Sequence, residues 1–210
     1  MSRIGAPEVV DAADPRAIDA AAAVLEGGGV VAIPTDTVYG LAARIDRPAG
    51  TAAVFAAKGR PPGLALPVLV GGWRQAHEVA SGWPRSASML AARFWPGALT
   101  VVVPVDPGLG GRLGGEGTSV GLRQPRHKFV QALCRRAGPL ATSSANRHGA
   151  PPCTTAAQVR EAFGAADVAL VVDGGTCDGQ PSTVVDCTVS PPVCVREGGI
   201  AWSWIEASLR

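Results

Sequence analysis

Short runs of apolar, often β-branched residues alternate along the chain with longer segments in which apolar residues recur at helical spacing. The run 99–103 is a strong strand candidate because three of its five residues are valine. Strands are expected at 30–33, 66–70, 99–103, 119–123, 140–143, 168–172, 182–186 and 193–196. Helices are expected at about 15–26, 49–57, 73–80, 85–95, 127–136, 154–163 and 202–209. Because strands and helices alternate irregularly, the pattern predicts an α/β fold with a mixed sheet.

Turn-forming residues mark the limits of these elements. Asp14 is expected to cap the first helix with Pro15 at its first position, and Gly27 follows its last residue. The glycine-rich segment 106–118 is expected to form a loop and to be the most mobile part of the chain. No internal repeat or linker divides the sequence, so residues 1–210 are interpreted as a single domain.

The composition limits the class of protein. Apolar residues make up 47% and charged residues 17% of the 210 residues, which is enough to bury a core and excludes a disordered chain. The sequence has no run of about 18 apolar residues and no signal-peptide pattern, so a cytoplasmic protein without a membrane span is expected. A net charge of +2 is too small to indicate nucleic-acid binding. The five cysteines lack a C-x-x-C pair and are expected to be reduced packing residues.

Polar side chains gather where several expected strands end. They are Thr35, Asp36, Thr37 and Tyr39 after the first strand, Arg123 at the end of the fourth, and Ser143, Ser144 and Asn146 around the end of the fifth. Open α/β sheets bind ligands at such strand ends. Turn formation and helix capping are the favoured explanation for any one cluster alone, but several clusters together favour a binding site. The isolated Asp173 and Asp186 are interpreted as turn acceptors, and no protein metal site is expected.

The segment 58–62, Lys-Gly-Arg-Pro-Pro, is the sharpest local feature. Lysine offers a compact charge and arginine a planar fork suited to phosphate or carboxylate, while Gly59 lets an anion approach the backbone. A basic helix C-terminus stabilised by the helix dipole is the competing explanation. The sequence has no P-loop pattern and no G-x-G-x-x-G after a strand, so any nucleotide would be held by a less common site.

Seven motifs carry a resemblance to a known family. They lie at 34–41 (PTDTVYGL), 58–61 (KGRP), 94–100 (FWPGALT), 120–125 (VGLRQP), 142–146 (TSSAN), 181–186 (PSTVVD) and 196–198 (REG). In this order they resemble the YrdC-type threonylcarbamoyl-AMP synthases, in the short single-domain form, over about residues 15–207. The resemblance implies a twisted open sheet with helices packed on it and a concave, basic active-site face.

The resemblance also implies a reaction. Threonine and bicarbonate form a carbamate that attacks the α-phosphate of ATP, giving threonylcarbamoyl-AMP and pyrophosphate. Mg²⁺ is expected to enter through the ATP phosphates, without a dedicated protein site. A separate transferase complex then passes the threonylcarbamoyl group to an adenosine next to the anticodon of certain tRNAs. The implied partners are ATP, L-threonine, bicarbonate and that transferase complex.

The resemblance assigns roles residue by residue. Lys58, Arg60, Ser144 and Asn146 are the implied catalytic residues, with Lys58 and Arg60 on the triphosphate. Thr35, Tyr39, Arg123 and Ser182 are the implied threonine-side residues, and the fork of Arg123 suits the carboxylate. Lys58, Arg60, Ser119, Asn146, Thr154 and Arg196 are the implied ATP-binding residues.

Two observations keep alternatives open. Leu64 stands where the family has a polar residue that reaches the threonine, and Ala65 replaces a proline, so a paralogue that adenylates the carbamate of a different amine remains an alternative. The implied basic face also suits double-stranded RNA or tRNA, either as the main ligand or as a weakly bound partner of the synthase. The sequence shows no aromatic stacking platform for RNA, and it identifies no general base for the amine.

Overall fold

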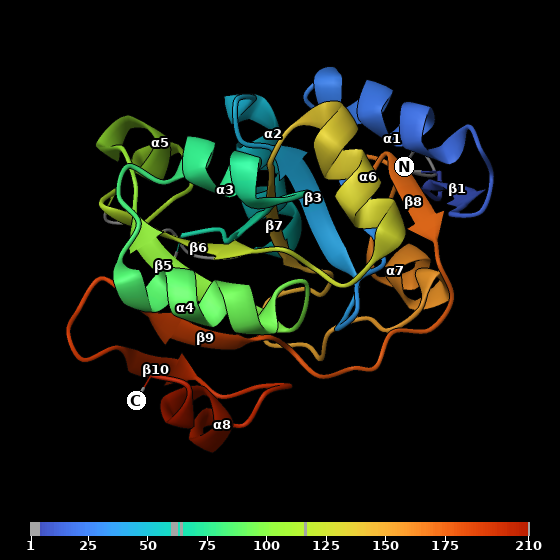
Figure 1. Cartoon of the computed structure of the whole chain (residues 1–210). Helices are drawn as coiled ribbons and strands as arrows, with labels where there is room; N and C mark the ends of the chain where they lie inside the picture. Colours follow the sequence, from blue (N-terminus) through green and yellow to red (C-terminus); the bar gives the residue numbers. More distant parts are fainter. Residues whose placement is uncertain (1–4, 60–62, 64, 116, 210) are drawn as a thin grey trace.

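Ten strands form one mixed sheet, and helices pack on both of its faces (Figure 1). The computed structural model describes residues 5–59, 63, 65–115 and 117–209. The strands are β1 (Glu8–Asp11), β2 (Val31–Ile33), β3 (Gly40–Arg44), β4 (Val68–Leu69), β5 (Leu99–Pro104), β6 (Ser119–Arg123), β7 (Leu140–Ser144), β8 (Leu170–Asp173), β9 (Thr183–Asp186) and β10 (Val193–Arg196). The helices are α1 (Ala17–Glu26), α2 (Pro48–Lys58), α3 (Trp73–Val79), α4 (Arg85–Phe94), α5 (Pro107–Arg112), α6 (Lys128–Ala137), α7 (Ala156–Ala162) and α8 (Trp202–Ala207).

The strand order confirms the expected α/β fold with a mixed sheet. Neighbouring strands follow the order β1-β8-β2-β3-β7-β4-β6-β5-β9-β10. Parallel pairs such as β5–β9 lie beside antiparallel pairs such as β5–β6. Among the described helices, none is both long and apolar enough to cross a membrane.

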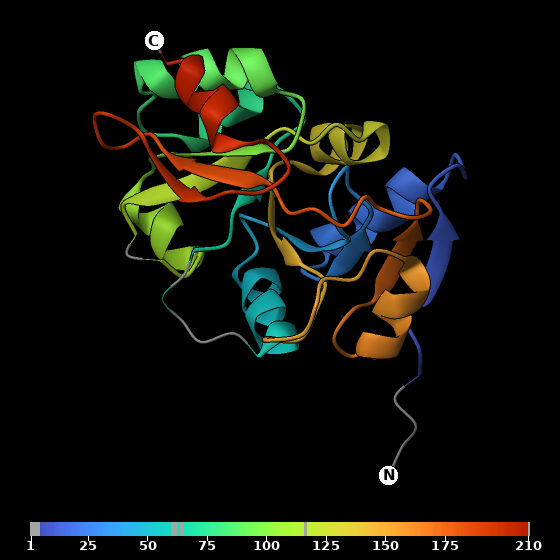
Figure 2. The same ribbon diagram turned by 90° about the horizontal axis from the view of Figure 1, so that it is seen from below.

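Helices cover both faces of the sheet around β8, β2 and β3 (Figure 2). On one face, Leu25 of α1 and Leu133 of α6 belong to the same buried cluster. On the opposite face, Val54 of α2 and Val159 of α7 belong to a second, larger cluster. This double cover explains why β2, with the sequence Val-Ala-Ile, is apolar at every position.

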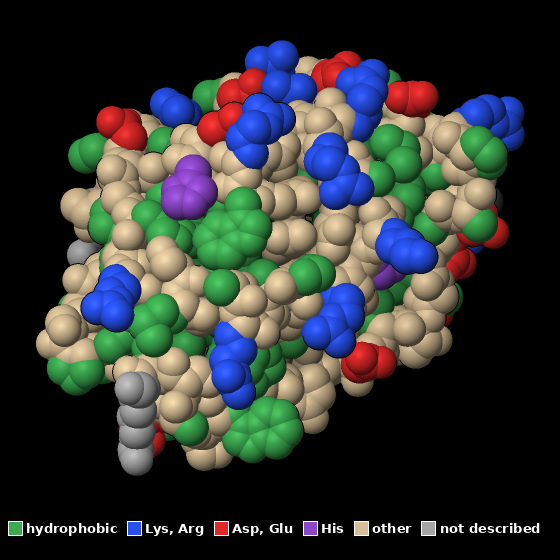
Figure 3. Space-filling view, in the orientation of Figure 1, with side chains coloured by type: hydrophobic (Ala, Val, Ile, Leu, Met, Phe, Trp, Pro, Cys, Tyr) green, Lys and Arg blue, Asp and Glu red, His purple; other side chains and the backbone are tan. Residues whose placement is uncertain are grey.

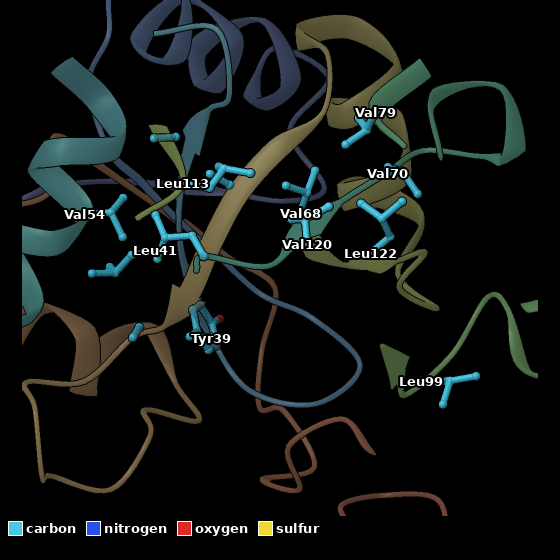
Figure 4. Packing of buried hydrophobic residues seen from close by; sticks show 14 of the residues in the cluster. Tyr39, Leu41, Val54, Val68, Val70, Val79, Leu99, Leu113, Val120 and Leu122 are labelled. Atoms are coloured by element: carbon cyan, nitrogen blue, oxygen red, sulfur yellow. The ribbon is translucent and has the colours of Figure 1, made fainter. Parts of the chain in front are cut away.

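The side chains of β2 alternate between the two clusters. Val31 and Ile33 belong to the cluster under α1 and α6, whereas Ala32 between them belongs to the larger cluster. Successive residues of a strand point to opposite faces, so all three are buried. Figure 4 shows the larger cluster, in which Val54 of α2 points toward Leu41 of β3.

The sequence pattern does not predict two of the strands, β1 and β3. β3 has the sequence Gly-Leu-Ala-Ala-Arg, which lacks the β-branched and aromatic residues that favour strands. It nevertheless pairs on both sides, because Gly40 lies opposite Ile33 of β2 and opposite Ser144 of β7. The two neighbouring strands satisfy its backbone, so tertiary context overrides the local preference.

The glycine-rich segment 106–118 contains a short helix, α5, and is not a loop throughout. The Asp106 carboxylate accepts a hydrogen bond from the Gly108 N–H at 2.8 Å and caps the helix. Pro107 stands at the first helical position, where its missing N–H costs nothing. The cap and the proline outweigh the low helix propensity of the glycines.

The start of α1 also differs from the expectation. The helix begins at Ala17, and no side chain caps it. The Asp14 carboxylate instead accepts a hydrogen bond from the Arg16 N–H at 2.8 Å. Asp14 and Pro15 therefore form the turn that precedes the helix.

The five cysteines, all of them described, are free thiols, and four are buried. Burial raises the pKa of the Cys134 thiol to about 12 and that of Cys187 to about 11. Such thiols stay protonated at neutral pH and behave as small apolar side chains. The expectation of reduced packing cysteines is confirmed.

Four aromatic side chains form one cluster around α3 and α4 that the sequence pattern does not reveal. The ring centroids of Trp73, Trp83 and Trp95 lie 5.8 to 6.2 Å from one another. His77 lies 4.9 Å from Trp83, and Trp73 is 38% exposed. The sequence does not reveal this aromatic cluster because its members come from three separate segments.

Replacing Leu133 by alanine should lower the free energy of unfolding by about 2–5 kcal/mol, because the side chain is fully buried and its loss leaves a cavity. Urea denaturation measures the effect. Lys128 is exposed on the same helix, and Lys128→Ala should change the free energy of unfolding by less than about 0.5 kcal/mol. Equal effects of the two substitutions would contradict the packing of α6 described here.

Candidate functional site

Lys58 is the last residue of α2, and its ammonium group lies against the end of β7. Gly59 ends the helix in the left-handed conformation, with φ of 62°, so the chain turns directly after Lys58. The Lys58 Nζ donates to the Ser144 carbonyl oxygen at 2.7 Å, to Ser144 Oγ at 3.1 Å and to Asn146 Oδ1 at 3.0 Å. Three of the four implied catalytic residues are thus in direct contact.

The amide of Asn146 is oriented by the loop that follows β7. Its Nδ2 donates to the carbonyl oxygens of Arg147 at 2.9 Å and Ala150 at 2.7 Å. Its Oδ1 is therefore left to accept from Lys58 and from the Ser144 hydroxyl at 2.6 Å. These bonds hold the ammonium group in one position, and Lys58 is only 5% exposed. We call Lys58, Ser144 and Asn146 the lysine cluster.

Arg147 supports the lysine cluster and has no role in the sequence analysis. Its Nη1 donates to the Ala57 carbonyl oxygen at 2.6 Å, and its Nη2 pairs with Asp167 at 2.7 Å. The His148 N–H donates to the Lys58 carbonyl oxygen at 2.8 Å. The last turn of α2 is therefore fixed to the loop after β7. The position of Arg147 directly after the TSSAN motif is the signal that could have identified it.

Arg123 at the end of β6 is 6% exposed, and each of its guanidinium nitrogens has a partner. The Nε donates to the Gly97 carbonyl oxygen at 3.0 Å, and the Nη1 donates to Thr37 Oγ1 at 2.9 Å. The Nη2 forms an ion pair with Asp36 Oδ1 at 2.5 Å. Arg123 therefore joins β6 to the segment 34–39 and to the turn at Gly97.

Burial and the neighbouring carboxylate of Asp36 shift the pKa of Arg123 in opposite directions. Burial lowers the pKa of Arg123, and the paired carboxylate of Asp36 raises it. Arg196 lowers the same pKa because it brings a second cation to this region. Asp36 and Thr37 lie among the polar residues after the first expected strand and carry no role implied by the motifs, although a buried arginine needs acceptors of this kind.

Thr35 and Tyr39 stand at the two ends of the polar segment that Arg123 binds. The Thr35 hydroxyl donates to the Val38 carbonyl oxygen at 2.7 Å and lies 2.8 Å from Thr37 Oγ1. Tyr39 is fully buried, and its hydroxyl donates to the Gly175 carbonyl oxygen at 2.9 Å. The Thr35 hydroxyl is thus linked to Arg123 through Thr37, whereas the Tyr39 hydroxyl faces the loop after β8.

Ser182 and Arg196 lie together at the β9–β10 pair. Ser182 Oγ lies 2.8 Å from Thr100 Oγ1, and the Arg196 Nη2 donates to the Ser182 carbonyl oxygen at 2.8 Å. A register shift between Cys194 and Arg196 marks this end of β10. The structure therefore joins one implied threonine-side residue to one implied nucleotide-side residue.

The other implied site residues are less closely connected. Ser119 is partly buried at the start of β6, opposite Pro104. The Thr154 hydroxyl donates to Gln158 Oε1 at 3.2 Å, just before α7. Arg60 and Leu64 lie outside the described residues. The described structure thus shows three hydrogen-bonded groups, around Lys58, Arg123 and Ser182.

Comparison with known proteins identifies the family. The family model Sua5_yciO_yrdC, described as "Telomere recombination", matches residues 23–198. The chain belongs to the Sua5/YciO/YrdC family. A Mycobacterium tuberculosis protein is 39% identical over 199 residues, which cover 92% of this chain and 91% of that protein. The resemblance inferred from the seven motifs is therefore confirmed.

Two other members of the Sua5/YciO/YrdC family are longer. A Bacillus subtilis protein named threonylcarbamoyl-AMP synthase is 40% identical over 92% of this chain and 56% of its own length. The crystal structure of Pyrococcus abyssi Sua5 complexed with L-threonine superposes with a TM-score of 0.86 and 38% identity. That match covers 91% of this chain and 56% of the Pyrococcus chain. The present chain thus spans just over half the length of these two relatives.

Replacing Arg123 by lysine should lower the free energy of unfolding by about 2 kcal/mol. Lysine keeps the charge but lacks the planar fork, so buried acceptors at Thr37 and Gly97 lose their donors. Urea denaturation measures the loss. Arg126→Lys is the matched control because Arg126 is exposed and donates to the Pro96 carbonyl oxygen, and about 0.5 kcal/mol or less is expected. Equal stability of both variants would contradict the importance of the fork.

Proposed function

We propose that this member of the Sua5/YciO/YrdC family is a threonylcarbamoyl-AMP synthase. It joins L-threonine, bicarbonate and ATP to give threonylcarbamoyl-AMP, pyrophosphate and water. The observation that carries the proposal is the buried lysine cluster, in a chain that is 38% to 40% identical to relatives named for this activity. The network around Arg123 supplies a second polar centre, as a reaction with two polar substrates requires.

The adenylation step breaks the bond between the α- and β-phosphates of ATP. A carbamate oxygen bonds to the α-phosphorus, and pyrophosphate leaves with the bonding electrons. Such transfers depend mostly on positioning and on stabilising negative charge. We assign Lys58 and Arg60 to the phosphates, and Ser144 and Asn146 to orienting the Lys58 ammonium group. The low exposure of Lys58 supports this assignment because a buried charge is screened less by water.

We assign Arg123, Thr35 and Ser182 to the threonine. The Pyrococcus relative, solved with L-threonine bound, supports an amino-acid subsite in this fold. The three bonds described for Arg123 use three of its five N–H groups, and the other two suit a carboxylate. The linked hydroxyls of Thr35 and Thr37 offer a partner for the threonine hydroxyl.

The nucleotide contacts are proposed for Ser119, Thr154 and Arg196 in addition to the lysine cluster. Mg²⁺ is proposed to bind to the phosphate oxygens of ATP and to reach the site with the nucleotide. No group of three or more His, Cys, Asp or Glu side chains that could hold a metal ion is found within the described part of the chain. The cations Lys58, Arg123 and Arg196 support a basic active-site face.

The chemistry of the product points to a partner. Threonylcarbamoyl-AMP is a mixed anhydride of a carbamate and a phosphate, so a transferase complex that accepts the threonylcarbamoyl group is proposed to consume it. Transfer to tRNA would place the protein in the cytoplasm.

Double-stranded RNA or tRNA binding is the second candidate function. The aromatic cluster of Trp73, His77, Trp83 and Trp95 favours a ligand with unpaired bases, such as a tRNA. Aromatic rings and arginine planes are the groups on which unpaired bases stack. Figure 3 shows hydrophobic side chains beside a histidine over α3 and α4, with Lys and Arg side chains spread over the same face. A mobility-shift titration of tRNA with the wild type and Trp73→Ala tests this function separately from synthesis.

The deciding experiment is pyrophosphate release from ATP and Mg²⁺, with threonine and bicarbonate omitted in turn. Release that requires both is expected of the synthase. A panel of amino acids then tests the departure at Leu64, because release with another amino acid but not with threonine indicates the paralogue. Absence of release from folded protein that binds tRNA would favour the RNA-binding function.

Lys58→Ala and Arg60→Ala should each lower kcat/KM for pyrophosphate release by at least about a hundredfold, because each removes a cation from the developing charge. Lys128→Ala removes the other lysine of the chain, which is exposed, and should leave the rate unchanged. Circular dichroism verifies the fold of each variant. Full activity of both Lys58→Ala and Arg60→Ala would show that the assigned site is wrong.

A further inference from the structure

The hydroxyl of Tyr39 lies between two segments that are far apart in the sequence. One is the polar segment 34–39, and the other is the loop 174–181 between β8 and β9. The Tyr39 hydroxyl donates to the Gly175 carbonyl oxygen at 2.9 Å and accepts from the Gly174 N–H at 3.1 Å. The side chain is fully buried. A single phenol thus satisfies both a donor and an acceptor of one loop.

The same two segments touch at further points. The Gly179 N–H donates to the Thr37 carbonyl oxygen at 2.8 Å. A β-carbon on Gly174 would lie 2.6 Å from Cγ of Pro34, which is closer than real atoms approach, so the loop lies directly against the start of the segment. The Cys177 N–H donates to the Thr154 carbonyl oxygen at 2.9 Å, which ties the middle of the loop to the residue before the α7 cap.

The loop has open space on its other side. Asp173, Gly174 and Gly175 border a cavity of about 480 Å³ that is also lined by residues 11–13 at the end of β1. The Ala12 N–H donates to the Asp173 carbonyl oxygen at 2.8 Å, and the Asp173 carboxylate accepts from the Gly175 N–H at 2.9 Å. The start of the loop is therefore packed on the Tyr39 side and open on the cavity side.

Both segments that the Tyr39 hydroxyl joins contain or lead into residues of the proposed site. The loop 174–181 leads directly into Ser182, and the segment 34–39 contains Thr35. Tyr39 contacts the region of the lysine cluster through its backbone, because the Ala145 N–H donates to the Tyr39 carbonyl oxygen at 2.7 Å. The hydroxyl and the backbone of this one residue therefore serve different parts of the site.

We propose that the Tyr39 hydroxyl is a positioning group that holds Ser182 and Thr35 in register, and that it is not itself a ligand of threonine. The inference rests on the proposed function, because it assigns these two residues to the threonine side. Loss of the hydroxyl removes both bonds that tie the exposed residues Gly174 and Gly175 to the buried ring of Tyr39. The loop can then shift into the adjoining cavity and carry Ser182 with it. The bond from the Ala145 N–H, between Ser144 and Asn146, to the carbonyl oxygen of residue 39 remains.

Tyr39→Phe tests the proposal, because it keeps the ring in the core and removes the hydroxyl alone. The KM for threonine in pyrophosphate release should rise about tenfold, while the KM for ATP should stay within about twofold of wild type. Thr51→Val is the matched control, since it removes a buried hydroxyl that donates to the Pro48 carbonyl oxygen within α2. Its kinetics should equal those of the wild type.

Tyr39 is the only tyrosine of the chain, so phenolate absorbance near 295 nm reports on this one group. Burial, helped by the nearby Asp173 carboxylate and Cys177 thiol and opposed by the Gly174 N–H, raises the pKa of Tyr39 to about 12. Gly174→Ala should open the contact with Pro34 and bring the pKa down toward the ordinary value of about 10. Rapid mixing to alkaline pH records the absorbance before the protein unfolds.

The double variant Tyr39→Phe/Gly174→Ala should have a KM for threonine close to the higher of the two single-variant values. Both changes break the same contact, that between the Tyr39 hydroxyl and the loop 174–181. An unchanged KM for threonine in Tyr39→Phe would overturn the proposal. An equal rise in the KM for ATP and for threonine would also overturn it, because it indicates a general structural defect.

Failure of the proposed function gives a different result. Pyrophosphate release by the wild type would then not depend on threonine. The hydrogen-exchange rates of amides in the loop 174–181 can still be compared between the wild type and Tyr39→Phe. Faster exchange of the Gly174 and Gly179 amides in Tyr39→Phe than in the wild type is expected if the hydroxyl holds the loop. Unchanged exchange at these amides would overturn the positioning role whatever the reaction.

Discussion

One buried cation, the guanidinium of Arg123, connects the segments on which the site depends. A charge removed from water is costly unless it is paired and hydrogen-bonded. Arg123 meets this condition with a carboxylate, a hydroxyl and a carbonyl oxygen from two separate segments. Moving the segment 34–39 would break these bonds and leave the charge unpaired. The position of this polar segment is therefore set by the requirement to satisfy one arginine.

The lysine cluster and the Arg123 network present two different cations, which we assign to two different substrates. Arg123 is paired with the carboxylate of Asp36, so little net charge is added where an amino acid, itself a zwitterion, is proposed to bind. Lys58 donates to a carbonyl, a hydroxyl and an amide oxygen at the end of β7 and in the loop that follows. A triphosphate needs concentrated positive charge, which we assign to Lys58 together with Arg60.

Much of the fold could be predicted from the sequence because the apolar runs are long and their period is clear. β5 and α6 are examples, since each carries an unbroken pattern of strand or helix. β3 could not be predicted, because its Gly-Leu-Ala-Ala-Arg sequence becomes a strand only between β2 and β7. Local residue preferences contain no information about neighbours that arrive from distant parts of the chain.

The same distinction applies to the site. Motifs identified Lys58, Ser144 and Asn146, and the structure shows these residues in contact. Asp36, Thr37 and Arg147 received no role, because their importance lies in which side chain or carbonyl oxygen they meet. Trp73, Trp83 and Trp95 likewise form a cluster only after α3 and α4 have packed. The sequence shows the type of each residue, but it does not show which residues contact one another in the folded chain.

The place of β8 in the sheet has a consequence for biosynthesis. β1 and β2 are among the earliest strands to leave the ribosome, yet both pair with β8, which begins only at Leu170. At roughly 5–20 residues per second, the early strands wait for several seconds or longer with unpaired edges and apolar faces. During that interval the nascent chain is open to aggregation and is a natural client for chaperones. The order of the strands thus makes aggregation a greater risk during synthesis than in the folded protein.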